Sequence, residues 1–256
     1  MPRIHLFEFE DLAWFPHILR NYMTDFLQAV SHVFDVYEPI MPIIEKGLAK
    51  SKTESIIDLA SGGGGGWQKI SPRLKEVYAN HKILLTDLYP NVESLEALAN
   101  QSEHIEVYRD SVDARCVPKA LKGLRTQFLS LHHFKEEDVQ SIFQNAVDDE
   151  QVLVVFEITE RSFKGALGIL FSPITALLIT PIIRPFSILR LVLTYIFPIL
   201  PLLILWDGMV SVFRTYSEKE LKSIIAKVKG HEDYAWELGK KMKGPGQVFY
   251  FLAYPK

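Results

Sequence analysis

Short apolar runs alternate with amphipathic stretches between residues 50 and 160. The runs cover residues 56–58, 82–87, 105–108, 127–134 and 151–158. Apolar runs of this length, bounded by turn residues, are typical of strands buried on both faces of a sheet. A helical spacing of apolar side chains marks residues 20–48, where Pro39 and Pro42 are expected to break or kink the helix. The pattern predicts a mostly parallel α/β sheet flanked by helices.

Five consecutive glycines, residues 62–66, follow the first of these runs directly after Asp58-Leu59-Ala60-Ser61. Glycine allows positive φ angles and close approach of the backbone to a ligand. The helix predicted next, over residues 68–80, can then begin at the ligand with its unpaired N–H groups facing it. A glycine run by itself also fits a flexible linker. Its place between a strand-like run and a helix-like run favours a nucleotide site.

The second apolar run ends in Asp87, an acid placed to accept hydrogen bonds from ribose hydroxyls. Both NAD and S-adenosylmethionine carry such a ribose. The dinucleotide fingerprint Gly-x-Gly-x-x-Gly fails, because its last position falls on Trp67 when counted from Gly62 and on Gln68 when counted from Gly63. A nucleotide-dependent oxidoreductase is therefore disfavoured.

The segment 58–64 resembles the first motif of the class I S-adenosylmethionine-dependent methyltransferases, with Ala60 where the first glycine usually stands. Residues 234–241 and 247–254 resemble the antiparallel hairpin that closes that fold. The resemblance implies a seven-stranded, mostly parallel, Rossmann-like sheet flanked by helices. It also implies an N-terminal helical cap (1–50), a cofactor-binding core (51–160 and 215–256) and a helical insertion after the fifth strand (161–214).

The same resemblance implies S-adenosyl-L-methionine as the cofactor. Its methionine end would lie on the glycine turn and Asp58, its ribose on the end of the second strand, its adenine on the pair after the third strand, and its methyl group near the turn after the fourth. The residues implied are Asp58, Ala60, Ser61, Gly62, Gly64, Asp87, Leu88, Asp113, Ala114 and Leu131.

Two histidines follow the predicted fourth strand, and Glu157 lies near the end of the fifth. An imidazole is suited to accept a proton at neutral pH, which a weakly acidic methyl acceptor requires. His133, His132 and Glu157 are accordingly the catalytic candidates. The alternative for the histidines is that one caps the next helix and the other packs. For Glu157, as for Glu160, the alternative is structural hydrogen bonding.

Three further side chains admit a role in the site or a structural one. Asp207 either orients substrate or caps a turn with Gly208, and Trp14 and Phe15 either shield the sulfonium or an apolar acceptor, or pack in a core. No metal site is expected, because the eight histidines are scattered and neighbouring histidines do not readily present one geometry to one ion.

The segment 165–206 carries only two charges, Arg184 and Arg190, and five prolines in 42 residues. Its uncharged runs are 19 and 16 residues long, against about 20 for a membrane span. We expect a hairpin that enters one leaflet from the cytosolic side, with both arginines reaching lipid phosphates. Two tilted spans, or a buried soluble cap or dimer surface, remain the alternatives.

Composition limits the partners. A net charge of −3 and a pI near 6.3 do not suit a nucleic-acid-binding surface, and a single cysteine suits a reducing compartment. The sequence thus predicts a methyltransferase at the cytoplasmic face of a membrane, acting on a lipophilic small molecule or lipid. The alternative function is a non-catalytic membrane adaptor that keeps the fold. Nothing in the sequence indicates an oligomeric state.

Overall fold

The computed structural model describes residues 1–243 and 246–256, which form two compact units. One unit comprises Met1–Phe34 and Thr159–Tyr216, and the other comprises Asp35–Ile158 and Ser217–Lys256. The first 34 residues thus belong with the apolar insertion, whereas residues 35–50, which the sequence suggested as part of the N-terminal cap, belong with the sheet. We call the two parts the helical unit and the sheet unit.

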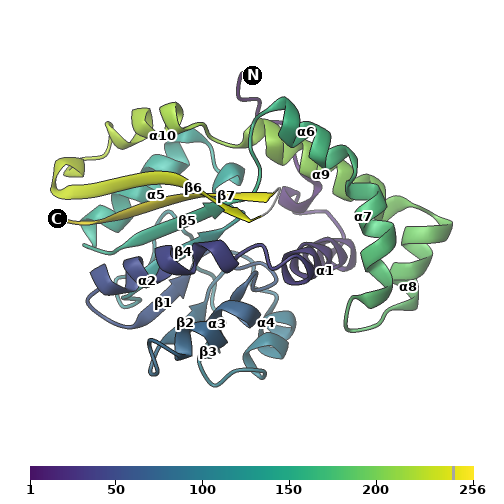
Figure 1. Cartoon of the computed structure of the whole chain (residues 1–256), viewed down its shortest axis with the longest axis horizontal. Coiled ribbons are helices and arrows are strands. Elements are labelled where there is room, and N and C mark those ends of the chain that lie inside the picture. Colours follow the sequence, from purple (N-terminus) through teal and green to yellow (C-terminus); the bar gives the residue numbers. More distant parts are fainter. Residues whose placement is uncertain (244–245) are drawn as a thin grey trace. The chain divides into compact units, whose positions relative to one another are not determined.

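The sheet unit contains seven strands in the order β3-β2-β1-β4-β5-β7-β6 (Figure 1). The first five are parallel, and β7 runs antiparallel to both β5 and β6. This is the predicted fold class, including the closing hairpin. The strands are β1 (Ser55–Asp58), β2 (Lys82–Leu85), β3 (Ile105–Val107), β4 (Leu124–Phe128), β5 (Leu153–Glu157), β6 (Tyr234–Lys243) and β7 (Gly246–Pro255).

Helices cover both faces of this sheet, as a buried parallel sheet requires (Figure 1). On one face α2 (Met41–Lys50), α3 (Trp67–Lys75) and α4 (Val92–Ala99) share a single hydrophobic core with β1, β2 and β4. On the other face lie α5 (Glu136–Asp148) and α10 (Glu218–Ile225), with the Phe143 ring of α5 stacked on Phe251 of β7 at 4.6 Å. A short 3-10 helix, η2 (Glu38–Ile40), precedes α2.

Two predicted boundaries in this unit were wrong. β4 begins at Leu124 rather than residue 127, because the charged Arg125 is accommodated inside the fold by Asp149 and Asn145. The helix after the glycines begins at Trp67 and ends at Lys75, five residues before the predicted end, with Pro72 inside it. Near Pro39, by contrast, the expected interruption is confirmed, since the helical run breaks between residues 33 and 38.

The helical unit is built from α1 (His17–Val33), α6 (Phe163–Leu170), α7 (Ser172–Ile179), α8 (Ile188–Leu191) and α9 (Ile199–Arg214). The helical unit also contains three short helices: η1 (Phe9–Asp11), η4 (Thr180–Ile182) and the π-helix η5 (Val192–Ile196). A further short helix, η6 (His231–Asp233), precedes β6 in the sheet unit. Both α6 and α7 pack against α9 (Figure 1).

Within the described residues, one continuous helical stretch, Phe163–Ile182, is long and apolar enough to cross a membrane. The return path, Ile188–Ile196 and Ile199–Arg214, passes the same test only as a pair, and it is bent by 78° at residues 197–198. Pro198 at this break explains the bend, since proline cannot continue the preceding helix.

Two expectations for the helical unit need correction, and one of the alternatives given for Phe15 is confirmed. Asp207 lies inside α9, and its carboxylate accepts the backbone N–H groups of Phe9 and Glu10 at 2.9 and 3.2 Å, so it anchors the N-terminal segment rather than a turn with Gly208. Arg190 is buried and paired with Asp25, so it does not reach lipid phosphates, whereas Arg184 is exposed. Phe15 packs in a core, and Trp14 is exposed.

Candidate active site

The turn after β1 has the backbone conformation that its glycines suggest. Gly62, Gly64 and Gly65 all adopt positive φ angles. A Cβ at Gly64 would overlap the side chain of Leu98, while the space around Gly62 is open. Glycine at position 64 is therefore required by both conformation and packing, and the backbone at position 62 presents an open surface to a ligand.

Ala60 also adopts a positive φ of 52°, at the position where the resembling family carries glycine. A left-handed conformation costs a residue with a Cβ about 1–2 kcal/mol, and only part of this is offset by the lower unfolded-state entropy of alanine. We expect Ala60→Gly to raise the free energy of unfolding by about 0.5–1 kcal/mol, measured by urea denaturation. The matched control is Ala97→Gly on the exposed face of α4, which should instead destabilise by about 1 kcal/mol.

Asp58 ends β1 and is buried in a network that ties the turn to β2 and β4. Its Oδ1 accepts a hydrogen bond from the Thr126 hydroxyl at 2.7 Å, and its carbonyl accepts from the hydroxyls of Ser61 and Thr86. Burial raises the pKa of Asp58 to about 6, although the Thr126 hydroxyl opposes the shift. The carboxylate is thus held in place and takes up a proton more readily than an ordinary aspartate.

Asp87 lies just beyond β2, and its carboxylate bridges two segments of backbone. One oxygen accepts from the N–H of Gly62 at 2.9 Å and the other from the N–H of Tyr89 at 2.9 Å. The Leu88 carbonyl accepts from the Ser111 hydroxyl, which joins this turn to the segment after β3. The structure therefore places Asp87 beside the glycine turn and Leu88 beside the segment after β3.

Asp113, proposed from the sequence for the adenine, is engaged by a neighbour. Both of its oxygens accept from the Arg115 guanidinium, at 2.7 to 3.1 Å, and Arg115 also contacts Asp138 of α5 at 2.8 Å. The Arg115 hydrogen bonds lower the pKa of Asp113. Ala114 is buried. Asp113 is thus a firmly ionised carboxylate whose acceptor positions are shared with Arg115.

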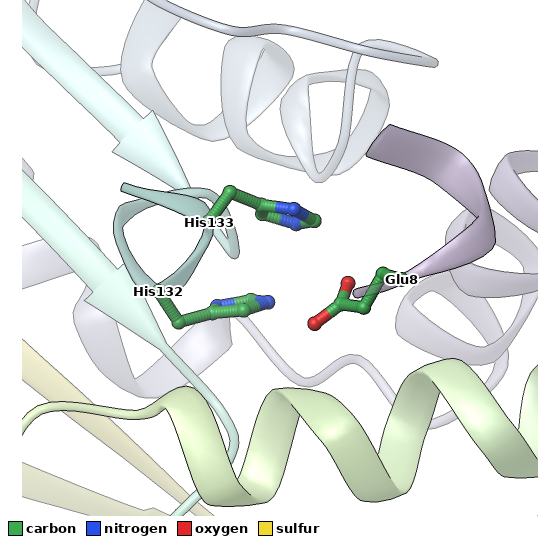
Figure 2. Close-up of side chains that lie close together, drawn as sticks. All are labelled: Glu8, His132 and His133. Carbon is green, nitrogen blue, oxygen red and sulfur yellow. The ribbon is translucent and has the colours of Figure 1, made fainter. Parts of the chain in front are cut away.

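The two histidines lie on η3 (Leu131–His133), the 3-10 turn that follows β4, and Leu131 is buried beneath them. The His132 Nδ1 lies 2.9 and 3.0 Å from the two Glu157 oxygens, and its backbone N–H donates to Glu157 at 3.1 Å. Figure 2 shows the rings of His132 and His133 side by side, with centroids 4.4 Å apart. It is His132 whose ring is bonded to Glu157.

The carboxylate determines the form of the His132 ring. Since Glu157 only accepts, the nitrogen facing it carries the proton, and Nε2 is the basic nitrogen of the neutral ring. Both residues are only 4% exposed, so the pair is shielded from bulk water. This is the arrangement in which a carboxylate orients a histidine base and stabilises its protonated form.

Three polar side chains of β4 and its turn were missed from the sequence. Thr126 holds Asp58, and the buried side chains of Gln127 and Ser130 have no hydrogen-bond partner among the described residues. Polar residues within an otherwise buried strand were the available sign. An unpartnered hydroxyl at Ser130, two residues before His132, together with the open backbone at Gly62, fits a polar ligand at this edge of the sheet.

This chain is similar to known proteins in its three-dimensional fold and not in its sequence. No family model and no curated protein matches the chain. The O-methyltransferase NcsB1 from neocarzinostatin biosynthesis, solved with S-adenosyl-L-homocysteine and 1,4-dihydroxy-2-naphthoic acid, has a TM-score of 0.54 at 13% identity, covering 91% of this chain and 57% of that one.

Two other solved structures are similar. The plantazolicin methyltransferase BpumL, in complex with SAH, has a TM-score of 0.49 at 11% identity, covering 94% of this chain and 98% of that one. An O-methyltransferase family protein from Burkholderia thailandensis has a TM-score of 0.48 at 12% identity, covering 86% of this chain and 56% of that one. This chain spans little more than half the length of NcsB1 and of the Burkholderia protein. The similarity to NcsB1 establishes the class I methyltransferase fold.

Proposed function

We propose that this chain, which has the class I methyltransferase fold, is an S-adenosylmethionine-dependent methyltransferase acting on a lipophilic acceptor at the cytoplasmic face of a membrane. The observation that carries the proposal is the buried pair formed by His132, on the turn after β4, and Glu157, at the end of β5. In the same sheet β1 ends in Asp58 and leads into the glycine turn. A scaffold has no use for an oriented, water-shielded base, which argues against the adaptor alternative.

The cofactor would lie along the carboxyl ends of β1, β2 and β4, where the fold places its ligands. The glycine turn and Asp58 would hold its methionine end and Asp87 its ribose. Asp113 and Ala114 would contact its adenine, in which case Arg115 shares the Asp113 carboxylate with the adenine amino group. NcsB1, which shares this fold, was solved with the demethylated form of this cofactor. Bound there, the cofactor supplies an electrophilic methyl group on a sulfonium.

The chain's own residues would then manage the acceptor's proton. His132 Nε2 takes the proton from the acceptor hydroxyl as the oxygen becomes nucleophilic, and the Glu157 carboxylate stabilises the resulting imidazolium. Glu157 is a positioning residue, because it acts through His132. An acceptor with an ionisable hydroxyl, such as a lipophilic phenol, suits such a base better than a carbon acceptor that loses no proton before attack.

The lipophilic character of the acceptor is supported by the helical unit. Many of its large apolar side chains are exposed, among them Phe171, Ile174, Leu178, Ile182, Ile188 and Ile196. Apolar surface of this extent marks an interface with a membrane or a partner. An enzyme held at a membrane meets acceptors that are dissolved in lipid, which is why we place the substrate class there.

Cofactor affinity should depend on pH through Asp58. Its pKa of about 6 means that the carboxylate becomes protonated below that pH and loses its attraction for the cofactor's ammonium group. We expect the Kd for S-adenosylmethionine to rise about tenfold per pH unit below 6. In the ligand-free protein Asp58 should act in the opposite direction: because its pKa is raised from 3.8 to about 6, its contribution to stability should be lost as the pH rises through that range. Asp58→Asn should flatten both profiles.

The deciding experiment is calorimetric titration of the detergent-purified protein with S-adenosylmethionine and S-adenosylhomocysteine, followed by a screen of lipid extracts with the methyl-labelled cofactor. Asp87→Ala should weaken binding by about 1–3 kcal/mol, the range for stranding a polar partner. Asp110→Ala, at an exposed aspartate of the neighbouring loop, is the control and should bind normally. Folded protein that binds neither ligand would rule out the methyltransferase and favour the adaptor.

A further inference from the structure

The insertion in the helical unit exposes many large apolar side chains, and some of its polar side chains are buried beside an apolar cluster of Ala176, Ile179 and Ile183. Thr180, Arg190 and Thr194 are buried, with the Thr194 hydroxyl donating to the Arg190 carbonyl at 2.7 Å. The exposed positions of the same segment are large and apolar, and only 17% of the Phe163–Ile182 window is buried. A soluble core helix is mostly buried, so a helix that is apolar and exposed in this way needs to be covered by lipid or by a partner.

Arg190 shows how the interior charge is neutralised. Its guanidinium pairs with Asp25 of α1 at 2.5 Å, lies 4.8 Å from the centre of the Tyr22 ring, and donates to the Pro185 carbonyl at 3.2 Å. The residue is 3 % exposed. The insertion and α1 therefore close on each other around this pair, and the outer surface of α7, α8 and η5 keeps only Arg184 as a charged residue.

The charges of the unit gather at the other end of α9. Arg214 contacts Asp11 at 2.6 Å and Glu8 at 3.3 Å, and Asp207 holds the backbone of η1. We call this end of the helical unit the polar base, and the end formed by Leu170–Ile199 the apolar tip. The two ends differ in charge: the sequence of the apolar tip contains two charged residues, Arg184 and Arg190.

Aromatic rings mark the boundary between base and tip. Trp206 contacts Phe7, Phe7 contacts Phe9, Phe9 contacts Phe15, and Phe15 contacts Trp14, with centroids 5.4 to 6.4 Å apart. Both tryptophans at the ends of this chain of rings are exposed, and the Trp206 indole N–H donates to the Phe7 carbonyl. Tryptophans at the edge of an apolar surface are typical of the membrane–water interface.

The depth below this boundary can be calculated from the helices. At 1.5 Å per residue, α9 extends about 10 Å from Trp206 to Ile199. On α6 the residue at the height of Trp206 is Ile169, because it packs against Gly208 of α9. From Ile169 to Ile182 the helix is about 20 Å long. A hydrocarbon core is about 30 Å thick, or about 15 Å per leaflet. Counted from this level, the tip reaches through about one leaflet, whereas the whole of Phe163–Ile182, about 30 Å of helix, would be needed to cross both.

We infer that the helical unit is a monotopic anchor: its apolar tip enters one leaflet of a bilayer, Trp14 and Trp206 lie at the interface, and the polar base stays in water. This inference specifies the membrane contact of the proposed function and rests on it. The 78° bend at residues 197–198 fits the same geometry, because η5 then turns aside within the leaflet instead of continuing across.

Flotation with phosphatidylcholine vesicles tests whether lipid is the occupant. Leu178→Asp and Ile196→Asp place a charge at tip positions that are 73% and 67% exposed. Each should lower the vesicle-bound fraction at least tenfold while cofactor titration stays unchanged. Val77→Asp, at an exposed apolar position of the sheet unit, is the matched control and should float like the parent protein. Parent protein that stays off vesicles and forms a stable dimer through these positions would overturn the inference.

Topology tests the depth. In a Cys116→Ser background, Arg184→Cys protein is bound to sealed vesicles that contain a membrane-impermeant maleimide. We expect no modification from the lumen, together with quenching of a fluorophore at Leu178→Cys by lipids brominated in mid-chain. Modification from the lumen would show a spanning hairpin and refute the one-leaflet depth. Because cofactor titration is read separately, failure here is distinguishable from failure of the methyltransferase proposal.

Discussion

His132→Ala is expected to slow methyl transfer by about 10²- to 10⁴-fold, the contribution of a positioned general base. The reason is geometric, since Glu157 fixes the ring so that Nε2 is the basic nitrogen. Binding of the cofactor should be unchanged, because the imidazole is assigned to the acceptor's proton. Single-turnover rates with a labelled methyl group and an acceptor from the lipid screen measure the effect, and calorimetry verifies the cofactor site.

His133→Ala is the matched control, because the His133 ring lies 4.4 Å from that of His132, centre to centre, and comes from the same turn. It should stay within tenfold of the parent rate. A loss confined to His133→Ala would transfer the role of base to that residue. Glu157→Gln should lower kcat more than it changes KM and should shift the pH profile of kcat, whereas a merely structural glutamate would change stability alone.

Asp149→Asn is expected to reduce the free energy of unfolding by about 3–5 kcal/mol, the range for stranding one partner of a buried ion pair. Arg125 is almost completely buried in β4, and its guanidinium pairs with Asp149 at 2.7 Å and donates to Asn145 at 2.9 Å. Burial lowers the pKa of Arg125, and the Asp149 carboxylate opposes that shift. Urea denaturation of the two proteins, with equal m-values, gives the difference directly.

Glu150→Gln provides the comparison for that measurement, since it removes a carboxylate from the next residue. Glu150 pairs with Lys52, but both side chains are exposed, so solvent screens the pair and the urea midpoint should not move. An Asp149→Asn midpoint equal to the parent's would mean that Asn145 alone satisfies the guanidinium. The beginning of β4 at Leu124, instead of residue 127, would then be explained by the apolar residues around it and not by the Arg125–Asp149 pair.

The local sequence was sufficient for the sheet and for the glycine turn. Short buried strands need apolar runs, and the turn between β1 and α3 needs residues without a Cβ at Gly64, so both are visible in a single sequence. The closing hairpin was likewise predicted from residues 234–241 and 247–254, which pair as β6 and β7. The beginning of β4 was not, because Arg125 looks like a surface residue until its distant partners are known.

The fold class, the candidate cofactor residues and the apolar insertion could be predicted from the amino-acid sequence, because these depend on residue type at nearby positions. The folded chain was needed to show that the His132 ring bonds Glu157, that Arg190 pairs with Asp25 instead of reaching lipid phosphates, and that Asp207 anchors the backbone of η1. Each of these contacts joins residues 25 to 198 positions apart. Their geometry depends on how the chain packs, which no local pattern of side chains encodes.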